Sequence, residues 1–462
     1  MTRGGPLTTR RTVIGGAAVL AAGEALAATA AAAPAAAPAT LGPPPGQTKF
    51  PDAAASDPVK LGWMQGSPPP PGKRIQFADN SAGRFPQLRW TYSHMRETLP
   101  TATVARAAKP WLLPSAPRDD IDSVSFQPQP NSGFDGPMTW QQSLAANYTD
   151  GIVVLHKGRI VHERYFGALA PAGTHIAFSV TKSFVGTLVA MLAEEGRIDL
   201  AAPVTLYLPE LAASGFAGAT VRDLLDMRSG IRFSENYTSP TDDIAVYTVA
   251  GGFVPRPAGW SGPGNFCDYL VTVGREAAPG GNFHYQTANT EVLAWLLRRV
   301  TGKPLRELLA ERLWQPMGAE QDAYFAIDSN GFDFGGGGLC ASLRDMARFG
   351  EVMRLGGIAN GQRIVPAVVV ADIARGGDKA AFATAAYTRL PGASYRSQWW
   401  CLHNEHGAYS ARGVHGQAIY IDPRAEMVIA RFASHPLAAN ANFDPTSLPA
   451  FHAVAKRLMG QG

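Results

Sequence analysis

Ser179 and Lys182 stand three residues apart, a spacing that could make the serine a nucleophile. In a helix, two residues at this separation lie on the same face, so the lysine amine could reach the serine hydroxyl. The N-terminus of a helix adds positive potential and backbone N–H donors, which suit a developing oxyanion. A partly buried lysine in this potential loses its proton more easily and could act as a base toward the serine. The pair therefore predicts acyl transfer through a serine nucleophile.

The stretch that must position this pair, residues 178–196, has the pattern of a buried helix. Its apolar residues recur at three- and four-residue spacing, and Gly196 is typical of the residue that follows a helix end. An arbitrary S-x-x-K tetrapeptide is more often a helix cap followed by a solvated lysine. Here that alternative is weakened, because the motif occurs once in the sequence, opens a strongly apolar helix and is followed by matching partners.

Tyr285 is the first of these partners. It follows a Pro-Gly-Gly sequence at 279–281 and precedes a predicted helix, so its phenol could be held rigidly and directed into a cleft. Near Lys182, the phenol could relay a proton from the serine to a leaving group. A tyrosine in this place is more often a core or surface residue. Only its occurrence together with Ser179 and Lys182 favours the catalytic role.

The second partner is the glycine-containing segment 409–423. Gly413 and Gly416 stand at the start of an apolar strand, where glycine lets a substrate approach the backbone closely. An edge strand here could offer a backbone N–H opposite that of Ser179 and complete an oxyanion hole. The alternative is a glycine turn that merely starts a strand.

The elements around these motifs predict an α+β fold, with an antiparallel sheet backed by helices and an all-helical insertion. A strand–turn–strand is expected at 151–156 and 160–166, and a hairpin at 417–421 and 427–432. Residues 231–265 are expected to form a long structured loop. Helices are predicted at 221–228, 291–300, 305–314, 343–355 and 448–458.

Three parts follow from composition along the 462 residues. Residues 1–40 combine Arg10 and Arg11 with a weakly apolar run and an alanine tract, which resembles a twin-arginine export signal and predicts a periplasmic or extracellular location. Residues 41–133 are a proline-rich linker and an N-terminal extension that packs on the catalytic domain, predicted at 134–462. After removal of the signal, no stretch is apolar enough to span a bilayer.

The charge and the cysteine content limit which binding partners, disulfides and metal sites the sequence predicts. A net charge of +4 without a basic run argues against nucleic acid. Cys267, Cys340 and Cys401 allow at most one disulfide, their pairing stays open, and no spacing resembles a zinc site. The predicted chemistry requires neither a metal nor an organic cofactor.

In their order along the chain, the motifs resemble the serine β-lactamase-like hydrolases, which include class C β-lactamases, D-Ala-D-Ala carboxypeptidases and esterases. Within that group the likeness is closest to the 6-aminohexanoate-dimer (nylon-oligomer) hydrolases, and it runs from about Arg89 to the C-terminus. Each motif is weak alone, and the ordered set is specific. The motifs lie at 99–101, 179–184, 224–230, 235–237, 283–285, 289–293, 336–339, 344–349, 415–417 and 422–423.

The resemblance implies a β-lactamase/transpeptidase-like fold with the site between an antiparallel sheet and an α-helical lobe. It implies Ser179 as the acylated nucleophile, Lys182 as its general base, and Tyr285 as proton relay and general acid. Tyr237 matches the position of a substrate-contacting tyrosine in the nylon-oligomer type, although a loop aromatic packed on the surface is the alternative. His415 and Gly416 are further candidates for substrate contact.

The sequence departs from the family pattern twice. A Y-x-N element would need asparagine at 287, where Thr287 stands. The K-T-G element has no true copy; its best register is 411–413, which makes the Val414 N–H the second oxyanion donor beside the Ser179 N–H. A rival register starts at His415. Without the lysine of K-T-G, Arg412 and His415 are the candidates to anchor a carboxylate, and efficient β-lactamase activity is disfavoured.

The sequence therefore predicts a serine hydrolase that cleaves an amide or ester bond of a small molecule through an acyl-enzyme. Two alternatives remain open. One is a D-Ala-D-Ala carboxypeptidase or β-lactamase of the cell envelope, which an export signal favours. The other is a receptor that is acylated without turnover. The sequence also leaves open whether the protein forms a homodimer.

Overall fold

The computed structural model describes residues 50–130, 133–134, 136–442 and 444–461. The predicted export signal at 1–40 lies outside these residues and stays a prediction. Within them, no helix is both long and apolar enough to cross a membrane.

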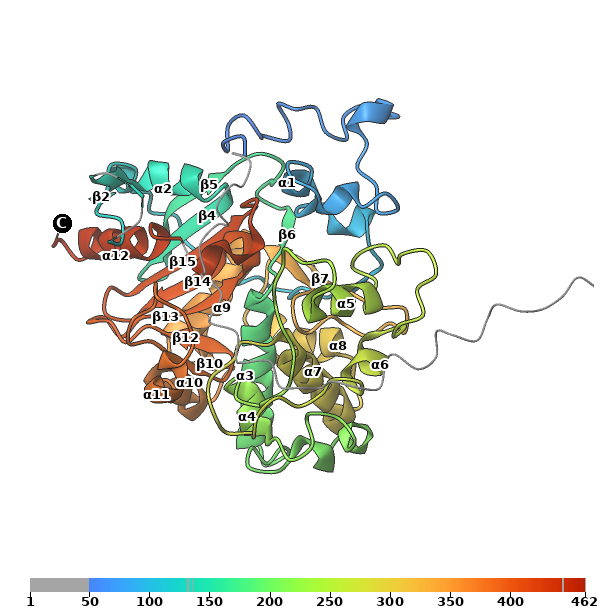
Figure 1. The fold of residues 1–462 in the computed structure, drawn as a ribbon. Helices are drawn as coiled ribbons and strands as arrows, with labels where there is room; N and C mark the ends of the chain where they lie inside the picture. The colour runs from blue at the N-terminus through green and yellow to red at the C-terminus, as the bar shows by residue number, and fades with distance from the viewer. Residues whose placement is uncertain (1–49, 131–132, 135, 443, 462) are drawn as a thin grey trace, which may run out of the picture. The chain divides into compact units, whose positions relative to one another are not determined.

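A seven-stranded antiparallel sheet forms one half of the fold, in the order β11-β12-β13-β14-β15-β4-β5 (Figure 1). Strands distant in sequence meet in this sheet, where β15 pairs with β4. Lys157 and Gly158 join β4 to β5, both with positive φ, which a tight hairpin turn requires. The predicted sheet and both predicted hairpins are confirmed. The strands are β4 Thr149–His156, β5 Arg159–Tyr165, β11 Ser394–Arg396, β12 Trp399–Cys401, β13 Tyr409–Gly413, β14 Gln417–Asp422 and β15 Met427–Ala433.

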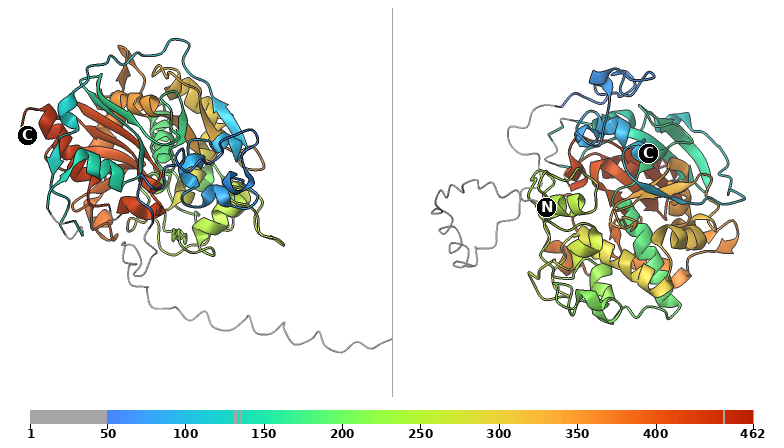
Figure 2. Two further views of the ribbon diagram at one scale, coloured as in Figure 1. Left: turned by 90° about the horizontal axis from the view of Figure 1, so that it is seen from above. Right: turned by 90° about the vertical axis from the view of Figure 1, so that its right-hand side faces the viewer.

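Alternating side chains of this sheet enter two different cores. Val153 and Leu155 of β4 pack in the large core beside α3 Val180–Glu194 and α9 Leu343–Arg354. Ile152 and Val154 pack in a smaller core under α2 Trp140–Ala146 and α12 Ser447–Leu458. The sheet is therefore covered by helices on both faces (Figure 2).

A second, four-stranded antiparallel sheet has the order β1-β7-β8-β6. Its edge strand β1, Thr101–Val104, comes from the N-terminal extension and pairs along its whole length with β7, Ala323–Ala326. The strands β8 Leu339–Ser342 and β6 Thr174–Ile176 complete it. β6 leads into α3, so the extension is joined through this sheet to the start of the serine helix.

Helices α4 to α8 form the predicted helical lobe, and α7 packs against α3. The long structured loop predicted at 231–265 is interrupted by one helix, α5, which Asp242 caps by accepting from the Ile244 N–H. Its valine-, threonine- and isoleucine-rich sequence has poor helix propensity, so tertiary packing decides the helix. The helices are α4 Val221–Leu225, α5 Asp243–Ala250, α6 Phe266–Leu270, α7 Thr287–Thr301 and α8 Leu305–Leu309, which continues as a π-helical turn over Ala310–Trp314.

The remaining helices and strands, outside the two sheets and the helical lobe, are short. All three cysteines are free, and Cys340 and Cys401 are buried. The elements are α1 Leu88–Thr91, α10 Ala367–Arg375, α11 Lys379–Ala383, β2 Ser125–Phe126, β3 Met138–Thr139, β9 Ile358–Ala359 and β10 Gln362–Arg363.

Candidate active site

Helix α3 begins directly after Ser179, which occupies its N-cap position. Every residue from Val180 to Leu192 is buried, so the helix runs through the centre of the fold between the large sheet and the helical lobe (Figure 1). Phe178 has a φ of 43°, an unusual backbone conformation that turns the chain sharply from β6 into the helix. Gly196 follows the helix with a φ of 73°, as predicted for a C-terminal cap.

Lys182 lies one turn into the helix, and its side chain is fully buried. Its Nζ lies 2.9 Å from Ser179 Oγ and donates to the carbonyl oxygen of Gly336 at 2.5 Å. Burial lowers the pKa of Lys182 to about 8, while the negative charges of Glu235 and Glu291 work in the opposite direction. A lysine in this state can take up a proton from the serine near neutral pH.

The turn that carries the Gly336 carbonyl is held in place by a buried carboxylate on α7. Glu291 accepts from the N–H groups of Gly335 and Gly336, at 3.1 and 2.9 Å, and from the Tyr247 hydroxyl at 2.6 Å. A Cβ on Gly336 would lie 2.5 Å from the Thr287 side chain, so this turn has no room for a larger residue. The glycine run at 335–338 thus forms a tight turn that positions a hydrogen-bond acceptor for Lys182.

Tyr285 precedes α7 and faces the same pair. Lys182 Nζ lies 5.3 Å from the centre of its ring. The ring stacks on Trp400 with centroids 5.3 Å apart. Burial raises the pKa of Tyr285 well above its ordinary value, so the phenol keeps its proton. The structure therefore brings Ser179, Lys182 and Tyr285 together, as the sequence predicts.

Strand β13 ends beside the backbone of Ser179. A Cβ on Gly413 would lie 2.9 Å from the carbonyl oxygen of Ala177 and 3.1 Å from the Ser179 nitrogen. Only glycine allows this approach without a shift of the backbone. The contact places Gly413 and Val414 next to the start of α3, and it favours the 411–413 register over the register that starts at His415.

His415 is bound on both sides of its ring within the protein. Nδ1 lies 2.6 Å from the His435 carbonyl oxygen, and Nε2 lies 2.9 Å from the hydroxyl of Tyr92 in the extension. Burial lowers the pKa of His415 to about 4, so the ring is neutral near pH 7. A neutral ring with both nitrogens engaged in the protein is poorly suited to anchor a substrate carboxylate. The direct substrate contact predicted for His415 stays a prediction.

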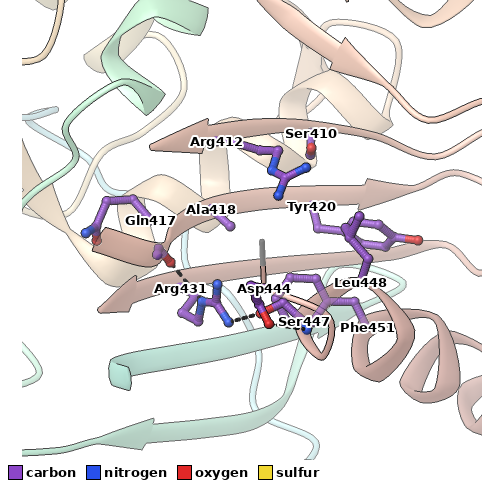
Figure 3. A pocket seen from close by; sticks show the side chains of 11 residues that line it. Ser410, Arg412, Gln417, Ala418, Tyr420, Arg431, Asp444, Ser447, Leu448 and Phe451 are labelled. Atoms are coloured by element: carbon purple, nitrogen blue, oxygen red, sulfur yellow. Dashed lines mark hydrogen bonds between the residues drawn. The ribbon is translucent and has the colours of Figure 1, made fainter. Parts of the chain in front are cut away.

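Arg412 and Gly416 line a small cavity on the face of the large sheet that carries α12 (Figure 3). Arg431 and Asp444 also line it, and Arg431 Nε donates to the Gly416 carbonyl oxygen at 2.8 Å. The Arg412 guanidinium lies 5.7 Å from the ring of Trp400, the residue on which Tyr285 stacks. Ser179 does not line this cavity. The Gly416 carbonyl is thus used within the protein.

Tyr237 lies on the loop between α4 and α5 and is 38% exposed. Its hydroxyl donates to Glu235 at 2.8 Å, and Glu235 also accepts from the backbone N–H of Thr287. The Glu235 charge raises the pKa of both Lys182 and Tyr285, and its bond to the Thr287 N–H ties it to the chain two residues after Tyr285. No pattern in the sequence indicates a role for Glu235, although it is part of the motif at 235–237.

One group in the described part of the chain has the residue types of a metal site: Glu405, His406 and His452, whose ligand atoms lie within 4.8 Å of one another. His452 Nε2 lies 3.0 Å from Glu405, and His406 Nδ1 lies 2.7 Å from Asp422. These ion pairs account for the arrangement. None of the residues around Ser179 belongs to the group.

Comparison with known proteins agrees with this geometry. The family model described as Beta-lactamase matches residues 142–446. The 6-aminohexanoate-dimer hydrolase of Paenarthrobacter ureafaciens is 35% identical over 389 residues, which cover 84% of this chain and 91% of that protein.

Solved structures give the same picture. A Bacillus anthracis protein, provisionally assigned as a 6-aminohexanoate-dimer hydrolase, superposes with a TM-score of 0.75 at 33% identity, over 82% of this chain and 96% of that one. The octameric penicillin-binding protein homologue from Pyrococcus abyssi matches with a TM-score of 0.52 at 18% identity, over 70% and 76% of the two chains. This second likeness concerns the fold alone.

Proposed function

This chain belongs to the beta-lactamase family and is a serine hydrolase, and from that premise we propose that it cleaves a linear amide or ester of a small molecule through an acyl-enzyme on Ser179. The observation that carries the proposal is the buried Lys182 amine, 2.9 Å from Ser179 Oγ, with a pKa lowered to about 8. A lysine that shares a hydrogen bond with a serine and loses its proton near neutral pH is equipped to activate that serine.

Acylation uses the three side chains in turn. Lys182 takes the hydroxyl proton while Ser179 Oγ attacks the substrate carbonyl, and the oxyanion is held by the N–H groups of Ser179 and Val414. Tyr285 gives its phenolic proton to the leaving nitrogen or oxygen and recovers one from Lys182, because its raised pKa keeps it a proton donor. The amine or alcohol leaves, and the acyl group stays on Ser179.

In deacylation, water replaces the leaving group and Lys182 again acts as the base. Water enters the space that the leaving group has vacated, and neutral Lys182, directly or through Tyr285, accepts its proton as the water attacks the ester carbonyl. The bond to Ser179 Oγ breaks, the serine recovers its proton, and a carboxylic acid is released.

A linear amide is favoured over a β-lactam by two observations. Ala411 stands where the K-T-G register would place a lysine, and its side chain is fully buried. The relative that matches over 91% of its length bears the name of a hydrolase of the 6-aminohexanoate dimer, a linear amide. We extend that substrate class to this chain.

We also propose export by a twin-arginine-type signal, with the hydrolase acting in the periplasm or outside the cell. The support is the paired Arg10 and Arg11 ahead of the weakly apolar run. Fusion of residues 1–40 to a reporter that is active only after folded export would test this part independently of catalysis.

The function is tested by parallel assays of the mature protein with four substrates: a short-chain p-nitrophenyl ester, a linear 6-aminohexanoate dimer, nitrocefin and a D-Ala-D-Ala peptide. Ser179→Ala serves as the blank. Cleavage of the ester or the linear amide with little nitrocefin turnover supports the proposal. Preference for nitrocefin or D-Ala-D-Ala would move the protein to antibiotic or cell-wall chemistry. Acylation of Ser179 on all four without turnover, seen by intact-mass spectrometry, would indicate a receptor.

A further inference from the structure

Tyr92 belongs to the N-terminal extension, yet it is buried against the start of the serine helix. It follows α1, its side chain is 7% exposed, and its carbonyl oxygen accepts from the N–H of Ile176 in β6 at 2.9 Å. The extension is therefore fixed to β6 at a point three residues before Ser179.

The ring of Tyr92 packs on the residue that precedes Ser179. It meets Phe178 edge to face, with ring centroids 4.9 Å apart. Phe178 has a φ of 43°, a conformation that a bulky residue holds only where its surroundings enforce it. The orientation of the next N–H, that of Ser179, depends on this backbone turn.

The hydroxyl of Tyr92 reaches the residue that follows Val414. It lies 2.9 Å from His415 Nε2, and His415 has a φ of 61°. Because the His435 carbonyl can only accept, His415 Nδ1 must carry the proton, and in the neutral ring Nε2 is left to accept from Tyr92. Phe178 and His415 also touch each other, with ring centroids 5.3 Å apart.

We propose that Tyr92 is a positioning residue that keeps the two backbone N–H donors of the oxyanion hole in register. Its ring fixes the backbone ahead of Ser179, and its hydroxyl fixes the backbone behind Val414. This inference rests on the proposed function, which supplies the oxyanion. It makes the extension a structural part of the active site.

The charged groups around Tyr92 do not compete for this hydroxyl. Asp150 is paired with Arg89 at 3.1 Å and lies 3.3 Å from His175, whose ring meets Tyr92 edge to face. Burial, together with the Asp150 charge, raises the pKa of Tyr92 far above its ordinary value. Burial keeps His415 neutral. The phenol therefore stays a donor and the imidazole an acceptor.

The test is Tyr92→Phe in the full mature protein, which removes one oxygen and keeps the ring. We expect kcat for the p-nitrophenyl ester to fall about 10- to 100-fold, the effect of a misplaced reactive geometry, with KM changed by less than about twofold. The affinity of a boronic acid, whose tetrahedral serine adduct places an oxygen in the oxyanion hole, should fall by the same factor as kcat.

Tyr148→Phe is the matched control, because the Tyr148 hydroxyl also ties the domain to the extension, by donating to the Pro51 carbonyl oxygen at 2.9 Å. It should leave kcat and boronate affinity within about twofold of wild type. Equal losses in both variants, or wild-type kcat and boronate affinity in Tyr92→Phe, would overturn the proposal.

A second readout separates this inference from the proposed function. A fluorophosphonate probe labels an activated serine whether or not the chosen substrates are turned over, and its phosphoryl oxygen occupies the oxyanion hole. Slower labelling of Ser179 in Tyr92→Phe than in Tyr148→Phe supports the positioning role even if all four substrates fail. Equal labelling rates contradict it even if the ester is hydrolysed. If Tyr92→Phe does not fold, His415→Phe removes the same hydrogen bond together with the one to the His435 carbonyl oxygen, and it should show at least the same loss.

Discussion

Glu291 and Lys182 are linked through a single residue, Gly336. The carboxylate accepts from the Gly336 N–H at 2.9 Å, and the Lys182 amine donates to the Gly336 carbonyl oxygen at 2.5 Å. The same carboxylate also raises the pKa of Lys182 through its charge. One buried acid thus acts on both the position and the pKa of the proposed base, although burial is the larger influence on that pKa.

The first prediction concerns the pH dependence of hydrolysis. Lys182 can act as a base only when neutral, so kcat/KM should rise about tenfold per pH unit at low pH and level off above a pKa near 8. Because burial keeps the Tyr285 phenol protonated, no alkaline decline should occur near the ordinary tyrosine value of about 10. A pH–rate profile on the ester checks both limbs, and an acidic limb near the ordinary lysine value would contradict the role of Lys182.

The second prediction follows from the charge of Glu291. Glu291→Gln removes a negative charge that raises the pKa of Lys182, so the acidic limb of kcat/KM should move to lower pH. The amide also leaves one of the two glycine N–H donors without an acceptor, which should cost about 1–3 kcal/mol of stability. Urea denaturation measures that cost separately from the pH profile.

Tyr247→Phe gives a graded comparison for this prediction, since it removes a hydrogen bond to Glu291 and leaves the carboxyl group in place. Burial raises the pKa of Glu291 to about 7, and the Tyr247 hydrogen bond counters part of that rise. Its loss should therefore destabilise the fold and neutralise part of the Glu291 charge, so that the acidic limb moves in the same direction as in the glutamine variant but by less. If Glu291→Gln loses stability and its profile stays where the wild-type profile lies, the carboxylate is a structural support and not a determinant of the Lys182 pKa.

The third prediction tests the approach of β13 to the serine helix. In Gly413→Ala, the new methyl group would lie 2.9 Å from the Ala177 carbonyl oxygen and 3.1 Å from the Ser179 nitrogen, which forces the strand away. We expect kcat to fall by about 10²–10³, the effect of losing one oxyanion donor. Gly72→Ala, at a site with no atom within 4 Å of the new methyl group, should leave kcat unchanged. A Gly413→Ala enzyme with wild-type kcat would show that Val414 does not serve the oxyanion.

Local patterns in the sequence were sufficient to predict the three residues of the proposed catalytic triad. The apolar period after Ser179 predicts a buried helix, and the fixed geometry of a helix then brings Lys182 within reach of the hydroxyl. Gly413 could be placed because a glycine before an apolar strand has a steric meaning. The helices at the C-terminal end and the central hairpins were predicted within a few residues, because their periodicity is strong.

The supports of the site depend on contacts distant in sequence, which no local pattern displays. In the sequence, Glu291 is one polar residue of an amphipathic helix. Only the fold brings its carboxylate within hydrogen-bond distance of the Gly335 and Gly336 N–H groups. Tyr92 and His415 are 323 positions apart. Helix α5 was missed for the opposite reason, since its local propensity is poor and packing overrides it.

The fourth prediction concerns the thiols. Burial raises the pKa of Cys267 and of Cys401 to about 12, and that of Cys340 further still. Thiolates are therefore scarce near neutral pH, and alkylation should be slow in the folded protein. Iodoacetamide and reducing agents should leave ester hydrolysis unchanged, with rapid alkylation of all three thiols in guanidinium as the control. Rapid loss of activity with alkylation of the native protein would place a thiol in the mechanism.

The last prediction concerns the ion pair that anchors the extension. Arg89 and Asp150 are both buried, with side chains 2% and 1% exposed. Arg89→Ala leaves the Asp150 carboxylate with only His175 beside it, and an uncompensated buried charge costs about 3–5 kcal/mol. Chemical denaturation should show a loss of this size, whereas Arg118→Ala, which breaks a pair that is about one-third exposed, should cost about 0–1 kcal/mol.

Asp150→Asn in the Arg89→Ala background gives the decisive comparison, because it removes the stranded charge itself. If the charge is the cause, the double variant should recover part of the stability that Arg89→Ala loses, and the two substitutions should be strongly non-additive. Additive losses would mean that Arg89 stabilises the extension chiefly through its other hydrogen bonds, those to the Ala53 carbonyl oxygen and to the Ser56 and Ser434 hydroxyls.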